Sequence, residues 1–269
     1  MISPLLSVES VDFSYSGDRV ILNGINLSFE KGKFYSVIGR NGSGKSTLVK
    51  LITGLLKDFK GNVSFEGKNI SSFPSKHLAR KISYIPQHNV FFDSDIKVTD
   101  FLALGRYSYK PFSQFRSTKD DADVVDHALE LLSIKDLADK NLGNISGGEK
   151  QKVIIALSLV QLNCAGELDG KMLVVDEPLT YLDVHYQFDI FNVLRNLNRE
   201  KGLTIITVTH DLNVAIKYTD ETILLENGSV VSKGNTLDII TEDTLTKYFM
   251  IKSQVVNFEN EHHINFITN

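Results

Sequence analysis

The most informative segment of this chain is Gly39-Arg40-Asn41-Gly42-Ser43-Gly44-Lys45-Ser46-Thr47. It fits the phosphate-loop pattern G-x-x-x-x-G-K-[ST] at every position. The apolar run Phe34–Ile38 before it predicts a buried strand, and Thr47–Ile52 after it predicts the start of a helix. Backbone N–H groups of such a loop, together with a helix N-terminus, bind phosphate. The segment therefore predicts nucleotide binding, with Lys45 reaching the terminal phosphates and Ser46 holding Mg²⁺.

Composition narrows the class of protein. The chain has 269 residues, of which 42% are hydrophobic and 23% charged, and its formal net charge is −4. This mildly acidic balance lacks the electrostatic footprint of a nucleic-acid binder, so we expect no nucleic-acid partner. Cys164 is the only cysteine, which excludes an intrachain disulfide and favours a reducing compartment. No run approaches the length of a membrane span, and the N-terminus does not resemble a signal peptide.

The region around the phosphate loop predicts strands. Leu6–Phe13, Val20–Phe29 and Gly61–Gly67 alternate apolar and polar residues, which indicates an antiparallel sheet flanking the nucleotide-binding core. Tyr15 is expected on one of these strands. On its own it is equally consistent with a half-buried strand aromatic and with a side chain that stacks on adenine.

Helical periodicity begins near Phe101, and we predict a helical insertion at about 89–161. Two apolar runs, Lys171–Asp176 and Leu203–Thr209, then predict buried strands, each followed by a helix. Such alternation indicates a parallel α/β core. A hairpin is predicted at Thr222–Val231, turning at Asn227-Gly228.

The whole of 1–256 is predicted to form one nucleotide-binding domain, followed by a polar tail at 257–269. We expect His262 and His263 to belong to this tail and not to a metal site, because no carboxylate or cysteine framework accompanies them.

Two acidic residues, Asp176 and Glu177, come directly after a predicted buried strand. The carboxyl end of a strand in an α/β sheet is where ligands bind, so these carboxylates are expected beside the phosphate loop. Asp176 can support Mg²⁺, usually through water. Glu177 can polarise an attacking water, which is the general-base task in phosphoryl transfer to water.

The segment Ser146-Gly147-Gly148-Glu149 precedes an apolar run. Its S-x-x-E spacing is that of a capping box, which starts a helix. A capping box does not require two glycines, whereas glycines there let an anion approach the helix N–H groups. The segment therefore predicts a second phosphate-binding surface.

Taken together, these residues resemble the ATP-binding cassette ATPases, in the order and approximate spacing of that family and over nearly the whole chain. The set comprises Tyr15, Gly39 to Thr47, Gln87, Ser146 to Glu149, Asp176, Glu177, Asp183 and His210. The resemblance implies an α/β fold: a P-loop NTPase (RecA-like) core with an antiparallel β-subdomain and an inserted α-helical subdomain.

The resemblance also implies roles for individual residues. Tyr15 would stack on adenine, and Gln87 would link Mg²⁺ and the attacking water to the partner interface. His210 would contact the γ-phosphate, and Asp183 would lie at the dimer seam. Two copies would close head to tail with ATP between the phosphate loop of one and Ser146-Gly147-Gly148 of the other.

The chain departs from the family pattern at two places. Glu149 stands where the signature sequence usually has Gln, which keeps the helix cap but adds a carboxylate near the partner's nucleotide. Tyr181 stands where a small residue is common. Neither change argues against catalysis.

One cassette without a membrane span resembles the cytoplasmic subunit of a bacterial-type importer, peripheral at the inner face of the cell membrane. The stretches Leu104-Gly105-Arg106-Tyr107 and Asp183-Val184-His185-Tyr186-Gln187 are similar to the ATPases of iron–siderophore, haem and vitamin B12 uptake. The resemblance thus implies ATP hydrolysis that drives uptake through a separate polytopic permease, with a periplasmic or surface substrate-binding protein as an indirect partner.

Alternatives remain at this stage. Zinc and manganese importers share much of the layout. A cassette ATPase of iron–sulfur cluster assembly would have a soluble partner instead of a permease. A P-loop kinase or GTPase would explain Lys45 but not Ser146-Gly147-Gly148 or His210, and no N-K-x-D guanine motif follows.

Overall fold

The structure is a computed structural model that describes residues 3–15, 19–87, 95–111, 118–177, 184–258 and 261–267. The chain divides into two compact units. The first unit comprises Met1–Ser72 and Ile205–Asn269, and the second comprises Phe73–Thr204.

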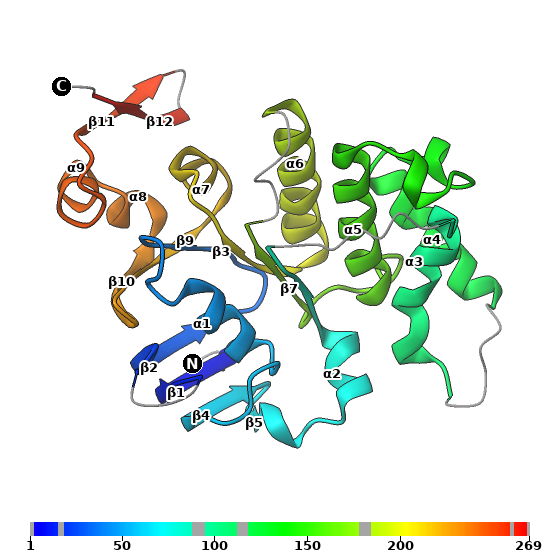
Figure 1. Ribbon diagram of the computed structural model, residues 1–269, viewed down its shortest axis with the longest axis horizontal. Helices are drawn as coiled ribbons and strands as arrows, with labels where there is room; N and C mark the ends of the chain where they lie inside the picture. The colour runs from blue at the N-terminus through cyan, green and yellow to red at the C-terminus, as the bar shows by residue number, and fades with distance from the viewer. Residues whose placement is uncertain are drawn as a thin grey trace. The chain divides into compact units, whose positions relative to one another are not determined.

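The N-terminal part of the first unit is an antiparallel sheet with strand order β2-β1-β4-β5 (Figure 1). Its strands are β1 (Leu6–Phe13), β2 (Leu22–Phe29), β4 (Lys60–Phe65) and β5 (Lys68–Asn69). Leu6 pairs with Phe29 on one side and Phe65 on the other, and all three side chains are buried. The predicted antiparallel sheet is confirmed. Tyr15 lies two residues beyond the end of β1 and not on a strand, because the pairing with β2 ends at Phe13.

The parallel core of the first unit is formed by β3 (Phe34–Ile38), which pairs with β8 (Thr204–Val208) and with β9 (Glu221–Glu226). Every residue of β3 and β8 is buried, as their continuous apolar character predicts. β9 turns back into β10 (Ser229–Asn235), which confirms the predicted hairpin. Helix α1 (Lys45–Ile52) follows the phosphate loop, and α7 (Leu212–Tyr218) follows β8.

The C-terminal part of the first unit differs from the predicted polar tail. After α8 (Thr236–Ile239), α9 (Glu242–Thr244) and the π-helical turn η5 (Leu245–Phe249), strands β11 (Ser253–Phe258) and β12 (Glu261–Phe266) pair as a hairpin. Ile264 is buried against a cluster that includes Leu212 and Leu245. Val255 packs on the same cluster, so apolar side chains from both strands dock this otherwise polar segment. His262 and His263 lie in β12.

The second unit contains the parallel strands β6 (Ile82–Ile85) and β7 (Met172–Asp176) and a group of helices. The helices are α2 (Ser75–Lys81), α3 (Val98–Ala103), α4 (Lys119–Leu131), α5 (Gly147–Gln161) and α6 (Val184–Lys201), with the 3₁₀ segment η2 (Leu104–Tyr109). Short 3₁₀ turns occur at η1 (Ile70–Ser72) in the first unit and at η3 (Lys135–Leu137) and η4 (Leu142–Asn144) in the second. Helices α3, α4 and α5 lie side by side (Figure 1). The limits of the helical insertion, about 89–161, stay a prediction.

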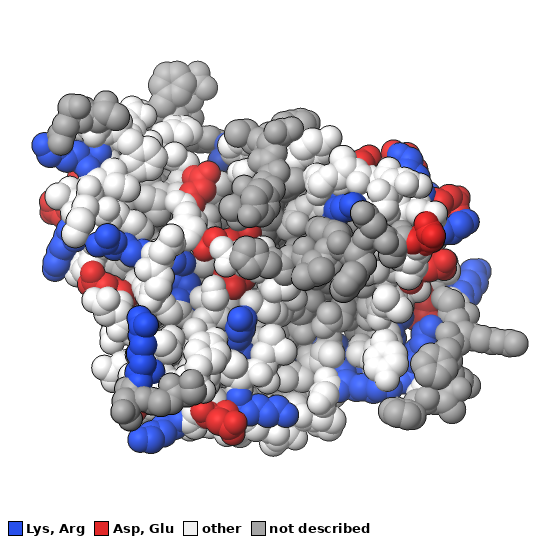
Figure 2. Space-filling view, viewed as in Figure 1, with Lys and Arg blue, Asp and Glu red and all other residues white. Residues whose placement is uncertain are grey.

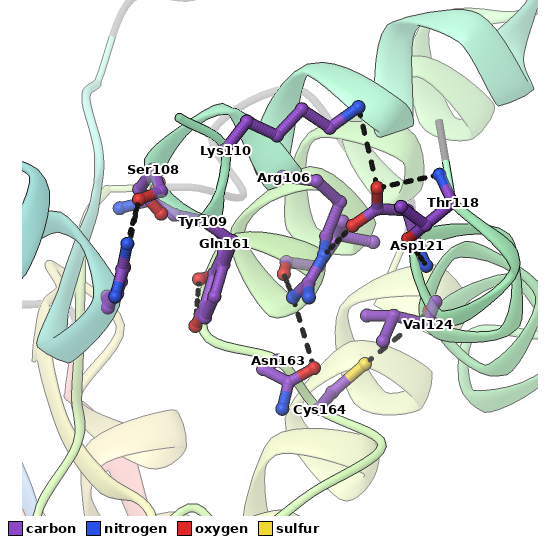
Figure 3. A network of polar contacts seen from close by, with 12 residues as sticks. Arg106, Ser108, Tyr109, Lys110, Thr118, Asp121, Val124, Gln161, Asn163 and Cys164 are labelled. Carbon is purple, nitrogen blue, oxygen red and sulfur yellow. Dashed lines mark hydrogen bonds and ion pairs between the residues drawn. The ribbon is translucent and has the colours of Figure 1, made fainter. Parts of the chain in front are cut away.

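A buried ion pair, Arg106 with Asp121, ties η2 to α4 (Figure 3). Arg106 Nε donates to Asp121 Oδ1 at 2.8 Å, Nη1 donates to Asn163 Oδ1 at 3.0 Å, and the guanidinium stacks on Tyr109. Burial alone would raise the pKa of Asp121, but the hydrogen bonds from Arg106 and Thr118 outweigh it and lower that pKa to about 2. Asp121 is therefore ionised at neutral pH and fixes η2 on the helices.

No described helix is both long enough and apolar enough to cross a membrane. On the face drawn in Figure 2, the described Lys and Arg side chains lie scattered among acidic and uncharged ones.

Candidate functional site

The phosphate loop connects β3 to α1 in the first unit. Its backbone requires glycine at Gly39, which has φ 151° and where a Cβ would lie 2.1 Å from the Leu225 carbonyl oxygen. The Lys45 side chain is 5% exposed, and its Nζ donates to the carbonyl oxygens of Gly39 (2.8 Å) and Arg40 (3.1 Å). Lys45 thus lies along the inside of the loop.

Ser43 provides a further sign of a ligand at this loop. Its side chain is 4% exposed, and its Oγ has no hydrogen-bond partner among the described residues. A buried hydroxyl without a partner is costly unless something else satisfies it. A bound phosphate oxygen would do so, which fits the predicted chemistry of the loop.

Strand register places His210 at the same sheet edge as the phosphate loop. Val37 of β3 pairs with Val208 of β8, and the two strands run parallel. Gly39 and His210 each come two residues after their member of this pair, so both follow the carboxyl ends of adjacent strands. His210 is exposed there.

Tyr15 lies near the first turn of α1. Its hydroxyl and Thr47 Oγ1 are 3.4 Å apart, and its ring packs edge-on against Phe13, with centroids 4.9 Å apart. The side chain is 56% exposed, so its ring is accessible for stacking on a flat ligand.

The second unit brings Gln87 and Glu177 together. Ile85 of β6 pairs with Val175 of β7, and each of the two polar residues follows two positions later. Gln87 Nε2 donates to Glu177 Oε2 at 2.6 Å. Glu177 has φ 49°, an uncommon backbone conformation for a side chain with a Cβ, and such outliers cluster at functional sites.

Asp176 is 1% exposed at the end of β7, and the Tyr84 hydroxyl donates to its Oδ2 at 3.2 Å. Sequence reasoning missed Tyr84, which is a partner of this carboxylate. Strand alternation could place Tyr84 in β6 but carried no signal for a contact with a residue 92 positions later in the chain.

The glycine-containing segment at the start of α5 has the geometry of a capping box. Ser146 is the N-cap: Glu149 N donates to Ser146 Oγ at 3.3 Å, and Ser146 N donates to Glu149 Oε2 at 2.7 Å. These hydrogen bonds lower the pKa of Glu149, so its carboxylate is ionised at neutral pH. Both sequence interpretations remain compatible, because the box leaves Ser146 and Gly147 exposed at the helix N-terminus.

The predicted residues therefore fall into three groups. The first unit holds Tyr15, Gly39 to Thr47 and His210; the second holds Gln87, Ser146 to Glu149, Asp176 and Glu177. Asp183, and Tyr181 before it, lie outside the described residues.

Comparison with known proteins decides the family. The family model described as ABC transporter matches residues 22–180, which begin in β2 and include the phosphate loop, the capping box and Glu177. The chain belongs to the ABC transporter ATPase family. The predicted fold class, a P-loop NTPase with α/β architecture, and the predicted class of enzyme, an ATP-binding cassette ATPase, are thereby confirmed.

This ABC ATPase is similar to one relative by sequence and to two solved structures. It is 35% identical to the iron(3+)-hydroxamate import ATP-binding protein FhuC of Bacillus subtilis (strain 168), over 93% of this chain and 90% of the relative. Its fold matches a chain of an ABC transporter solved in an inward-facing conformation and described as of metal-chelate type, with TM-score 0.81 and 25% identity, over 98% of this chain and 97% of the other. It also matches the cassette MJ0796, solved as a dimer in a post-hydrolysis state with ADP and Pi, with TM-score 0.71 and 25% identity over 86% of this chain and 98% of the other.

Proposed function

We propose that this ABC ATPase is the ATP-hydrolysing subunit of an importer for an iron chelate, and that a siderophore, haem or cobalamin complex is the class of cargo. The observation that supports the cargo class most directly is the 35% identity with FhuC, an iron(3+)-hydroxamate import ATP-binding protein, over nearly the full length of both chains. The metal-chelate transporter among the structural neighbours agrees with it.

In the first unit, the loop Gly39 to Thr47 would enclose the phosphates of ATP. Lys45 would exchange the carbonyl oxygens that it now contacts for phosphate oxygens, and Ser43 Oγ would gain its missing partner. His210 would contact the γ-phosphate, because it follows the strand next to the loop. Tyr15 would stack on adenine with its exposed ring.

In the second unit, Glu177 would act as the general base toward water. The Gln87 amide N–H already orients one carboxylate oxygen of Glu177, so the base is held in position before reaction. Membership of the ABC family supports assigning Asp176, Glu177 and the phosphate loop to the same nucleotide.

The chemistry of the donor set fits Mg²⁺. The Ser46 hydroxyl, the Gln87 amide oxygen and the Asp176 carboxylate are all oxygen ligands, which this cation prefers. Mg²⁺ held by them would neutralise charge on the phosphates. Tyr84 would orient Asp176 through its hydroxyl.

Two copies of the chain would close head to tail around ATP. The exposed Ser146, with the N–H groups of Gly147 and Gly148, would face the γ-phosphate bound by the partner subunit. The dimeric state of MJ0796 supports this arrangement. Asp183 would lie at the same seam. The dimer would act on a polytopic permease at the cytoplasmic face of the membrane, with a substrate-binding protein as an indirect partner.

Two variants test the chemistry. Lys45→Ala should lose ATP binding, and Glu177→Gln should keep it but release phosphate very slowly. Equilibrium binding of a fluorescent ATP analogue and a phosphate-release assay separate the two effects. Turnover at the unmodified rate in Glu177→Gln would remove that residue from the role of general base.

A pull-down from detergent-solubilised membranes tests the transport role. Recovery of a polytopic membrane protein with the tagged chain supports an importer, and recovery of only soluble partners contradicts it. Uptake of a ⁵⁵Fe-loaded hydroxamate by cells carrying Lys45→Ala should fall to the background level. If iron uptake is unchanged and zinc or manganese uptake is impaired, the cargo is that metal and not an iron chelate.

A further inference from the structure

The C-terminal hairpin packs against the rest of the first unit. Ile264 is 4% exposed in a cluster with Leu212, Ala215 and Leu245, and Val255 packs on the same cluster. The backbone N–H of Ile264 donates to Asn213 Oδ1 at 2.7 Å. The hairpin is therefore fixed to α7, the helix that follows β8 and His210.

The open end of this hairpin presents apolar side chains to solvent. Met250, Phe266 and Ile267 are 74%, 53% and 53% exposed. They belong to one end because Ile267 N donates to the Lys252 carbonyl at 2.9 Å, which continues the strand pairing toward Met250. Single exposed apolar residues are ordinary, whereas three at one end of a docked element indicate an interaction surface at that end. Phe266 and Ile267 are successive residues of a paired segment, so their side chains point to opposite faces of the hairpin.

This apolar end, formed by Met250, Phe266 and Ile267, adjoins the phosphate loop. Arg40 Nη1 contacts the Met250 sulfur at 3.8 Å, and Arg40 is itself exposed. Met250 lies where η5 ends and has a left-handed backbone conformation (φ 60°). This conformation is energetically unfavourable for a residue with a Cβ. Met250 thus joins this end of the hairpin to the phosphate loop.

We infer that the apolar end is covered by a second copy of this chain when ATP closes the dimer. This inference rests on the proposed function, in which the phosphate loop of one copy faces Ser146-Gly147-Gly148 of the other. The charges agree with it, since Arg40 beside the apolar end is cationic and Glu149 at the start of α5 is an ionised carboxylate. The hairpin enlarges the ATP-dependent interface and leaves ATP binding by a single copy unchanged.

The test uses the full chain with Glu177→Gln, which is expected to keep ATP. Sedimentation velocity with ATP and Mg²⁺ gives the dimer dissociation constant, and a fluorescent ATP analogue at low protein concentration gives the affinity of the monomer. Replacing Met250, Phe266 and Ile267 by serine should raise the dimer constant about tenfold or more and leave the monomer's ATP affinity unchanged. Leu55→Ser, at an equally exposed apolar residue of the same unit, is the matched control.

An unchanged dimer constant in the triple variant would overturn the inference, as would an equal effect of Leu55→Ser. If the parent Glu177→Gln chain does not dimerise with ATP at all, the proposed function fails and the inference with it. If the triple variant misfolds, the dimer dissociation constant is measured with Met250→Ser alone. A photo-crosslinking p-benzoylphenylalanine at position 266 should join two copies only when ATP is present, and crosslinks confined to one chain would refute the second copy as occupant.

Discussion

Replacing Arg106 by methionine tests how far the second unit depends on its buried ion pair. Arg106 is 6% and Asp121 4% exposed, so the change removes one charge of a pair that has little water around it. Breaking a buried pair in this way costs about 3–5 kcal/mol, because the other charge is left uncompensated. Lys110 Nζ at 3.4 Å and the Thr118 N–H at 3.0 Å still contact Asp121, which favours the lower end, about 3 kcal/mol.

Native-state hydrogen exchange with mass spectrometry measures this loss locally. A loss of about 3 kcal/mol corresponds to roughly 100-fold faster exchange in peptides from α4, since 1.4 kcal/mol is a factor of ten. The double variant Arg106→Met with Asp121→Asn should recover more than half of the protection, because Asn keeps an oxygen for Thr118 without the charge. Exchange less than tenfold faster in Arg106→Met, or no recovery in the double variant, would refute the reasoning.

The same pair has a pH signature. The pKa of Asp121 is lowered to about 2 in the folded state from an ordinary value of 3.8. A depressed carboxyl pKa stabilises the fold above the unfolded value, and this stabilisation is lost as pH falls from about 4 toward 2. Arg106→Met should weaken that acid dependence in the same α4 peptides.

Three further predictions concern other elements. Gly39→Ala should lower ATP affinity more than tenfold in a fluorescent-nucleotide titration, because its Cβ would clash with a backbone carbonyl oxygen. Ser146→Ala should destabilise the start of α5 by about 1 kcal/mol. Glu149→Gln should lower stability by less than this at neutral pH, and it should reduce the loss of stability in acid. Thermal unfolding followed by circular dichroism compares the two variants. Ile264→Ser should weaken the docking of the hairpin by about 3 kcal/mol and make the hairpin the first site of limited proteolysis. Cleavage at the same rate as in the unmodified chain would contradict this docking.

The strands and their connections were predictable because each has a local pattern. Neighbouring residues alone indicate the continuous apolar runs of β3, β7 and β8 and the turn at Asn227-Gly228. The structure confirms these predictions. The C-terminal hairpin was not predictable in this way. Its docking depends on Ile264 joining a cluster with residues from other elements, such as Leu212 of α7, and the polar composition of the segment gives no local sign of this contact.

The candidate site shows the same division. The phosphate loop and the acidic pair after β7 follow from residue types at fixed spacing. The contacts of Tyr84 with Asp176 and of Gln87 with Glu177 arise from the register of β6 on β7, which no local pattern encodes. The roles of Tyr15, His210 and Asp183 came from family resemblance and remain predictions.

Cys164, which lies within the contacts drawn in Figure 3, has a practical consequence for spectroscopy. It is fully buried, and burial raises the pKa of its thiol to about 11, so it is almost entirely protonated at neutral pH and reacts slowly with maleimides. The chain also contains no tryptophan. A single cysteine or tryptophan introduced at the surface would therefore be the dominant reporter in this protein, and fluorescence could follow one chosen position through the ATP cycle without removal of any native residue.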